Sequence, residues 1–218
     1  MELTFIFFDF NAVTITDMRY MLESIPNSHF YHRKVQDLLN DNLKIDVIVS
    51  PSNSFVGMEG GIDKILNGKE VFKDIREIVR AKMATLADTD NKKILKVTKN
   101  DITHKKVINK YVGDLYLPVG KCLLVETENE LCPFLASAPT MINPGTTISG
   151  TENVYHSFKA VLTEIYKNFR NNETCVLACS GLGTNVGGMT GVDSGKQMYK
   201  AYIDFMEEKG KKGKKEEE

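Results

Sequence analysis

The sequence lacks several features that mark whole classes of protein. No apolar run approaches the ~20 residues that a helix needs to cross a bilayer. The first ten residues include Glu2 and no basic residue, so they do not have the basic region of a secretory signal. The net charge of −1 gives no general reason to expect binding to nucleic acid or to an anionic membrane. We therefore expect a cytoplasmic protein without a membrane partner.

Cysteine is scarce, and its spacing is uninformative for metals. The four cysteines, Cys122, Cys132, Cys175 and Cys179, form no C-x-x-C pair, and their spacing provides no partners for a metal site. Their surroundings are typical of strand interiors, which indicates buried free thiols in a reducing compartment. We expect no metal and no cofactor.

The composition otherwise is that of an ordinary globular protein. At 218 residues, with 42% hydrophobic and 26% charged residues, the chain can bury a core and fits a single α/β domain. We expect this domain to span residues 1–208 and to be a monomer. A lysine-rich insertion is predicted at 88–110, and a disordered charged tail at 209–218.

One stretch, Asp46–Asp63, organises the chain. It begins with consecutive β-branched residues, Val47-Ile48-Val49, which are typical of a strand covered on both faces. Turn formers follow, then Gly60-Gly61 and the start of a helix at Ile62. Such an order places a ligand-sized crevice at the carboxyl end of a central strand. The alternative is a tight connection without a ligand.

Apolar patterns predict alternating strands and helices along the rest of the chain, and therefore a mixed central sheet. Strands are expected at 3–8, 29–34, 45–49, 122–125, 131–136 and 174–178. Helices are expected after a cap at Thr16-Asp17, at 62–66, from about Glu70 to Met83, from Thr151 to Phe169, and from Asp193 or Ser194 to about Met206.

A second unusual loop, Ser180 to Met189, follows the last predicted strand. Six of the 16 glycines lie between Gly181 and Gly195. Successive N–H groups with small or no side chains form a concavity that binds anions. The loop has neither the lysine of a Walker motif nor the spacing of a Rossmann fingerprint. It favours a diphosphate ligand, and the alternative is a glycine-rich structural turn.

Taken together, these stretches resemble the macro domains, which bind ADP-ribose, and most of all their phage-tail-associated and bacterial branch. VSPSNSFVGMEGGID at 49–63 is similar to the family's first ligand loop. LPVGK, ASAPTM and SGLGTNVGGM are similar to three later signatures of that branch, in the same order. The resemblance covers nearly the whole chain except 88–110 and the tail. It implies a three-layer α/β/α fold and binding of ADP-ribose or ADP-ribosylated proteins.

The resemblance also implies roles for individual residues. Asp37, with Leu38 beside it, matches the aspartate that accepts a hydrogen bond from the adenine amino group. Asn53 matches the asparagine that contacts the distal ribose, and Asp63 matches an aspartate that helps to activate water in the hydrolase branch. Gly60 and Gly61 match glycines that pack against the distal ribose. The loop that binds the diphosphate through its backbone matches Gly183, Thr184, Asn185, Val186, Gly187 and Gly188.

The sequence departs from the family pattern at three of these places. Ser50 replaces the first asparagine of the first loop, and Glu59 replaces a glycine, which puts a carboxylate near the diphosphate. Asn185 replaces a glycine, although asparagine tolerates positive φ better than other side chains do. The aromatic residue that stacks on adenine is not fixed by the pattern, and Phe10 and Tyr199 are candidates.

Several functions follow as hypotheses. The first is hydrolysis of an ADP-ribosyl ester or of an ADP-ribose derivative, with Asp63 and Asn53 as the catalytic residues. Asp63 has the alternative role of an acid that favours the helix dipole. The second function is a non-catalytic reader of ADP-ribose. The third is a structural, virion-associated protein that keeps the fold alone. Nucleic-acid binding through the lysines of 92–110 is weakly supported because aromatic residues are not interleaved with them.

Overall fold

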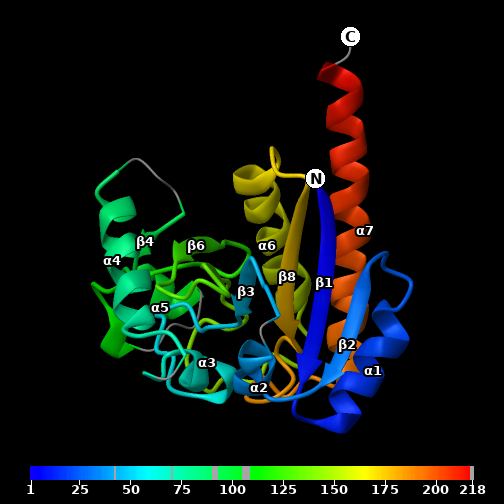
Figure 1. Cartoon of the computed structure of the whole chain (residues 1–218). Coiled ribbons are helices and arrows are strands. Elements are labelled where there is room, and N and C mark those ends of the chain that lie inside the picture. Colours follow the sequence, from blue (N-terminus) through cyan, green and yellow to red (C-terminus); the bar gives the residue numbers. More distant parts are fainter. Residues whose placement is uncertain (42, 70, 90–92, 105–108, 217–218) are drawn as a thin grey trace.

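A six-stranded sheet lies at the centre of the protein. The computed structural model describes residues 1–41, 43–69, 71–89, 93–104 and 109–216. The strand order is β2-β1-β8-β3-β7-β6. The first five of these strands are mutually parallel, and β6 runs antiparallel to β7. This arrangement confirms the predicted mixed α/β class and brings the carboxyl ends of five strands to one edge (Figure 1).

The elements alternate along the chain much as the sequence predicts. The sheet strands are β1 Glu2–Asp9, β2 Ser28–His32, β3 Val47–Ser50, β6 Leu123–Glu126, β7 Phe134–Ser137 and β8 Thr174–Ser180. The helices are α1 Ala12–Leu22, α2 Val35–Asn40, α3 Gly61–Leu66, α4 Ile75–Ala87, α5 Lys99–His104, α6 Asn153–Phe169 and α7 Gly191–Glu216. A small second sheet pairs β4 Leu95–Lys96 with β5 Leu115–Tyr116.

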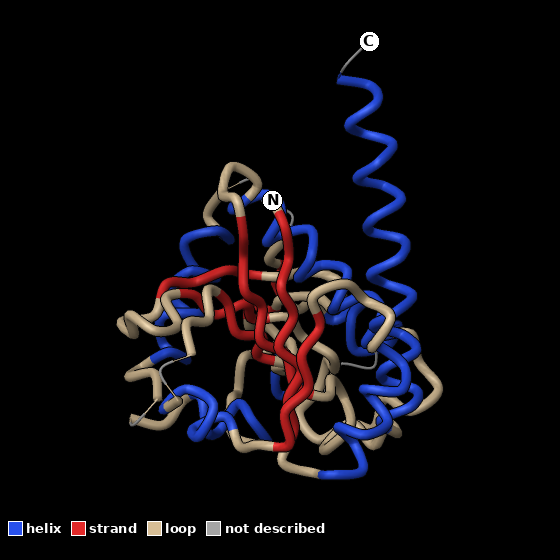
Figure 2. The backbone as a smooth tube through the Cα atoms, turned by 45° about the vertical axis from the view of Figure 1, so that its right-hand side comes forward, coloured by secondary structure: helices blue, strands red, loops and turns tan. Residues whose placement is uncertain are grey.

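Helices cover both faces of the sheet, because consecutive strand residues point to opposite faces. On one face, Phe5 and Phe7 pack in a core with the apolar sides of α1, α6 and α7. On the other, Ile6 and Phe8 pack with α2, α3 and α4. Figure 2 shows the sheet between these two sets of helices. The four cysteines are buried and free, as expected.

The start of α1 differs from the prediction of a cap at Thr16-Asp17. The helix begins one turn earlier because Asn11 caps it, with its side-chain Oδ1 accepting the N–H groups of Val13 at 2.9 Å and Thr14 at 3.4 Å. An asparagine at this position satisfies N–H groups that the first turn leaves unpaired. The chain therefore turns into a helix directly after β1 ends.

The lysine-rich stretch is partly packed against the domain. Phe55, Val97 and Tyr116 form a small buried cluster, and Tyr111 stacks on Phe55 with ring centroids 3.9 Å apart. Residues 90–92 and 105–108 of the predicted insertion lie outside the described residues, as does Glu70, the predicted start of a helix that begins at Ile75. The described part of 88–110 is thus a supported surface element that reaches the first loop.

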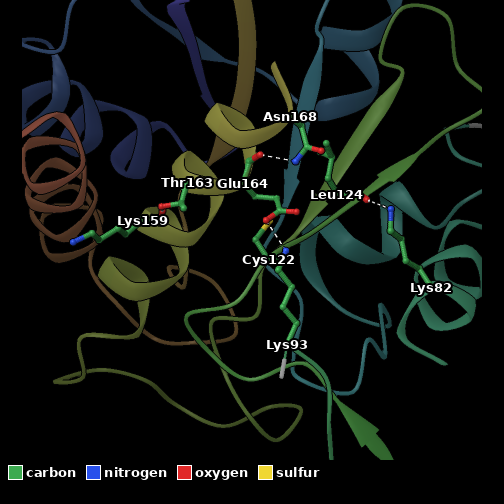
Figure 3. A network of polar contacts seen from close by, with 8 residues as sticks. All are labelled: Lys82, Lys93, Cys122, Leu124, Lys159, Thr163, Glu164 and Asn168. Carbon is green, nitrogen blue, oxygen red and sulfur yellow. Dashed lines mark hydrogen bonds and ion pairs between the residues drawn. The ribbon is translucent and has the colours of Figure 1, made fainter. Parts of the chain in front are cut away.

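Two lysines hold the edge strand β6 (Figure 3). Lys82 on α4 donates to the carbonyl of Leu124 at 2.8 Å, and Lys93 donates to that of Cys122 at 3.3 Å. Lys93 also pairs with Glu164 on α6 at 2.5 Å. Exposed carbonyls on an edge strand invite pairing with another chain, which these contacts block. Lys93 is therefore part of the fold and is not a free cation for a nucleic acid.

The last helix is longer than predicted. α7 continues to Glu216 and extends beyond the other elements (Figures 1 and 2), whereas the sequence predicts that the chain is disordered from 209. Lys and Glu are good helix formers, and a helix that is already nucleated by packing extends at low cost. None of the described helices is both long and apolar enough to cross a membrane.

Candidate functional site

A cavity of about 490 Å³ opens at the edge where the parallel strands end. Its walls come from the segments that follow β1, β2, β3, β7 and β8, together with α3. Because each wall follows a different strand, the order of the strands in the sheet is also the order of the chemical groups along the cavity.

The end of β1 provides one wall. Asp9 is only 9% exposed, and its carboxylate accepts the N–H of Asn11 at 2.9 Å. Burial raises the pKa of Asp9 above its ordinary value, and the backbone N–H groups of Asn11, Gly181 and Phe10 partly oppose this. Next to it, the Phe10 ring is 62% exposed and lines the cavity. A carboxylate acceptor thus lies beside an open aromatic face.

The loop after β3 provides the opposite wall and is held in an unusual conformation. Asn53 Oδ1 accepts the N–H groups of Phe55 at 3.0 Å and Gly57 at 3.3 Å. Val56 and Met58 have φ angles of 52° and 48°, which is rare for side chains of this kind and indicates stored strain. Asn53 lines the cavity, and its Nδ2 has no acceptor within the described part of the chain.

Asp63 lies in the first turn of α3, on the cavity wall, and is 7% exposed. Ser50, at the end of β3, donates its hydroxyl to Asp63 Oδ1 at 2.7 Å. Burial raises the pKa of Asp63 from 3.8 to about 7, although the Ser50 hydrogen bond lowers it. The carboxyl group therefore changes protonation near neutral pH, which suits a general base.

The loop after β8 provides unpaired backbone donors. Met189 donates to the carbonyl of Gly183 at 3.0 Å, which closes the loop on itself. The N–H groups of Asn185, Val186 and Gly187 have no acceptor among the residues that the structure describes, and all three residues line the cavity. Three successive free N–H groups form a concavity for an anion.

The packing of this loop requires glycine. A Cβ on Gly187 would lie 2.5 Å from the carbonyl oxygen of Gly183, and a Cβ on Gly183, whose φ is +71°, would lie 2.7 Å from Ile148. Thr184 tightens the turn, because its hydroxyl donates to the carbonyl of Gly181 at 2.8 Å. Close packing and this hydrogen bond therefore define the shape of the loop.

The two predicted loops face each other, as expected. A Cβ on Gly60 would lie 3.7 Å from Val186, and a Cβ on Gly61, whose φ is +55°, would lie 3.7 Å from the Asn185 side chain. Both loops line the same cavity, as does Glu59, which is exposed.

Three predicted residues do not reach the cavity. Asp37 is exposed on α2, and Leu38 beside it is buried in the core at 1% exposure. Tyr199 packs against the other core from α7. None of them is part of the cavity lining, so the structure does not bring Asp37 and Leu38 to the wall with which the resemblance associates them. Gly188 also lies outside the lining, and its φ of +69° turns the chain back toward α7.

Several residues that line the cavity were not among the site residues predicted from the sequence. Asp9, Arg33 and Lys34 line the cavity at the ends of β1 and β2, and Thr140 lines it after β7. A signal for Asp9 was present, because a short polar run, Asp9-Phe10-Asn11, follows a continuous apolar strand. Among the described residues, no group of three His, Cys, Asp or Glu side chains is placed to hold a metal.

Comparison of the chain with the profiles of known protein families finds no match, and a search among curated proteins finds none either.

Proposed function

We propose that this chain is a macro-domain-like protein that binds ADP-ribose, free or attached to a protein, with a three-layer α/β/α fold. The observation that carries the proposal is the row of unpaired N–H groups at Asn185, Val186 and Gly187. It lies after β8, between the wall of Asp9 after β1 and the wall of Asn53 after β3. A diphosphate in the middle of a linear ligand fits such a row.

The order of the walls matches the order of groups in ADP-ribose. The base lies at the β1 end, the diphosphate against the β8 loop, and the distal ribose at the β3 end. The cavity volume, about 490 Å³, lies within the range of about 300–1,000 Å³ that is usual for small-molecule sites. Asn53 Nδ2 donates to a hydroxyl of the distal ribose, and Gly60-Gly61 admit the sugar.

The base end uses Asp9 in the role that the resemblance assigns to Asp37. The Asp9 carboxylate accepts a hydrogen bond from the amino group of adenine, and its shielded position makes that bond strong. The exposed face of Phe10 stacks on the base, as aromatic side chains do with nucleobases. Of the two predicted stacking candidates, Phe10 is the one that lines the cavity.

The reaction we propose at the distal end is hydrolysis of an ADP-ribosyl ester or related derivative. Water attacks the anomeric carbon, the bond from that carbon to the leaving oxygen breaks, and the Asp63 carboxylate accepts a proton from the water. Ser50 holds one carboxylate oxygen, and the other accepts no hydrogen bond from the described residues. A pKa of about 7 leaves a large share of Asp63 ionised at neutral pH.

A non-catalytic reader is the second candidate function. The low exposure of Asp63, 7%, together with its hydrogen bond to Ser50, favours a structural role for this carboxyl group. The same cavity then binds ADP-ribose or an ADP-ribosylated protein without turnover. The third candidate function is that of a virion-associated protein that retains only the fold. In that case the cavity should not bind ADP-ribose.

Calorimetry with ADP-ribose and with ADP tests binding. We expect ADP-ribose to bind and Phe10→Ala to weaken it at least tenfold. Phe10 is exposed, so its loss leaves the fold intact. Tyr20→Ala, at an exposed ring on α1 outside the cavity lining, is the matched control. Absence of heat with millimolar ADP-ribose would overturn both ligand-binding functions.

A turnover assay with an ADP-ribosylated protein separates the enzyme from the reader. Asp63→Asn keeps the size of the side chain and removes the base. Release of ADP-ribose by the wild type, with at least a hundredfold loss in Asp63→Asn and little change in affinity, supports hydrolysis. Equal slow rates in both proteins would leave the reader as the function.

A further inference from the structure

The 3-10 turn η1, Asn109–Tyr111, and the end of β5 contact the loop after β3. The N–H of Leu117, directly after β5, donates to the carbonyl of Ser54 at 2.9 Å. Tyr111 stacks on Phe55 with ring centroids 3.9 Å apart and ring planes 10° apart. None of these four residues is part of the cavity lining. Any influence of the turn on a ligand must therefore pass through the loop after β3.

The position of Phe55 sets the direction of the Asn53 amide. Asn53 Oδ1 accepts the N–H of Phe55 at 3.0 Å and that of Gly57 at 3.3 Å. The loop wraps closely around the same side chain, since a Cβ on Gly57 would lie 3.0 Å from Asn53 Nδ2. Because the backbone holds the oxygen, Nδ2 is the part of the amide that is left to donate to a ligand. A shift of Phe55 would therefore turn the amide away from the distal ribose.

The loop after β3 needs support because its backbone is strained. Val56 and Met58 have φ angles of 52° and 48°, and such angles persist only where the surrounding packing enforces them. One support is the core on the face of α2, α3 and α4, in which both side chains are buried. Phe55, which precedes Val56, is 7% exposed and packs in a separate cluster with Val97 and Tyr116. The second support therefore comes from the residues around β4 and β5.

From these contacts we infer that Tyr111 is a positioning residue for the distal ribose of the ligand. Its ring holds Phe55 in place, and Phe55 holds the amide of Asn53 toward the sugar. The inference rests on the proposed binding of ADP-ribose and adds to it a residue outside the cavity, directly after the stretch 88–110 that the resemblance leaves out. The base and the diphosphate lie against the segments after β1 and β8, so Tyr111 should leave their binding unchanged.

Calorimetry with ADP-ribose and with ADP tests the inference, because ADP lacks the distal ribose. Tyr111→Ala should weaken the binding of ADP-ribose about fivefold or more, the effect of one lost hydrogen bond, and that of ADP by no more than about twofold. Tyr111→Phe keeps the ring and should bind both ligands as the wild type does. Val112→Ala is the matched control, because Val112 is the exposed neighbour of Tyr111 in the chain. If Tyr111→Ala does not fold, Tyr111→Leu retains an apolar cover over Phe55 and should show the same difference between the ligands.

A double-mutant cycle shows whether the effect passes through Asn53. Asn53→Ala removes the amide that Tyr111 positions. In the Asn53→Ala background, Tyr111→Ala should weaken the binding of ADP-ribose by no more than about twofold further, because two residues on one path have non-additive effects. Full additivity of the two substitutions would mean that Tyr111 does not act through Asn53, and this result would overturn the inference.

Amide hydrogen exchange in the ligand-free protein gives an independent measurement. The N–H groups of Phe55 and Gly57 should exchange about tenfold or more faster in Tyr111→Ala, and at the wild-type rate in Tyr111→Phe. The N–H of Leu131 is the internal reference, because it donates to Asn129 Oδ1 at 2.9 Å in a contact of the same kind. Unchanged exchange at Phe55 in Tyr111→Ala would show that the Tyr111 ring does not hold the loop.

The outcomes separate this inference from the function on which it rests. If the wild type binds ADP-ribose and ADP, and Tyr111→Ala weakens both equally or neither, the positioning role is wrong and the proposed function stands. If the wild type binds neither ligand, the proposed function fails and the role of Tyr111 in recognition of the ribose fails with it.

Discussion

The hydroxyl of Ser50 donates to Asp63 Oδ1 at 2.7 Å, and both side chains are buried. This contact joins the end of the central strand β3 to the first turn of α3. It fixes the position of the one carboxyl group on the distal wall whose pKa is raised to about 7. Ser50 itself is not part of the cavity lining, so it positions Asp63 and does not touch a ligand.

Ser50→Ala should raise the pKa of Asp63 above about 7. The hydrogen bond favours the ionised carboxylate, so its loss makes the proton harder to remove. The measurement is an NMR titration of the Asp63 carboxyl carbon. Ser52→Ala is the control, because Ser52 is equally buried and its hydroxyl contacts that of Ser137. An unchanged or lower pKa in Ser50→Ala would show that Ser50 does not stabilise the charge.

Asp63→Asn should make the free energy of unfolding depend less on pH. The folded pKa, about 7, lies above the ordinary value of 3.8, so the folded state holds its proton where the unfolded chain has lost it. The contribution of Asp63 to wild-type stability therefore falls as pH rises from about 4 to about 7, with a slope of at most about 1.4 kcal/mol per pH unit. Below pH 4 and above pH 7 the free energies of unfolding of the two proteins should change with pH in the same way.

Urea unfolding at pH 4, 5.5, 7 and 8 measures this difference. The free energy of unfolding of Asp63→Asn minus that of the wild type should increase between pH 4 and pH 7. Asp88→Asn, at an exposed position after α4, should show no such growth. A constant difference between wild type and Asp63→Asn across the series would mean that Asp63 is not buried as a titrating group.

Gly187→Ala should reduce the affinity for ADP-ribose at least tenfold and destabilise the fold by about 1–3 kcal/mol. The added Cβ would lie 2.5 Å from the Gly183 carbonyl oxygen and 2.9 Å from Ile148, so the loop must shift and its N–H groups lose their alignment. Gly210→Ala is the control, since nothing lies within 4 Å of its Cβ in α7. It should leave affinity unchanged and stabilise the helix by up to about 1 kcal/mol.

Circular dichroism and calorimetry on the same samples distinguish the two effects of Gly187→Ala. A folded variant with wild-type affinity would show that the loop does not bind the ligand through its backbone. Gly188→Ala provides a second test if Gly187→Ala fails to fold. Its Cβ would come no closer than 3.2 Å to Thr147, although its φ of +69° makes the substitution strained.

The sheet and most helices could be predicted because burial leaves a local pattern. Phe5 to Phe8 form a continuous apolar strand, and the apolar residues of α6 recur at helical spacing. The start of α1 could not be placed in the same way. Four consecutive β-branched residues, 13–16, follow Asn11 closely and favour a strand over a helix. Only the capping contacts reveal that the helix begins there.

The site was predicted in part for a similar reason. Gly60, Gly61, Gly183 and Gly187 mark the two loops in the sequence, because the backbone geometry there requires glycine. Asp9 lines the cavity and Asp37 does not, because β1, which ends at Asp9, is the strand that pairs with β8. Strand order is set by packing across the whole sheet, so the position of neither aspartate can be read from its neighbours.

Glu59→Gln should increase the affinity for ADP-ribose about twofold. Glu59 is exposed and lines the cavity near the proposed diphosphate site. At the distances of such a cavity, in largely aqueous surroundings, removing one unit charge is worth on the order of a twofold change. The gain should vanish in high salt, which screens exposed charges. Glu128→Gln, between β6 and β7 at the opposite edge of the sheet, should leave the affinity for ADP-ribose unchanged.

Calorimetry at two salt concentrations shows whether Glu59→Gln raises or lowers the affinity for ADP-ribose. A loss of affinity in Glu59→Gln would mean that the carboxylate accepts hydrogen bonds from the ligand's hydroxyl groups, and Glu59 would then belong with Asn53 among the residues that bind the distal ribose.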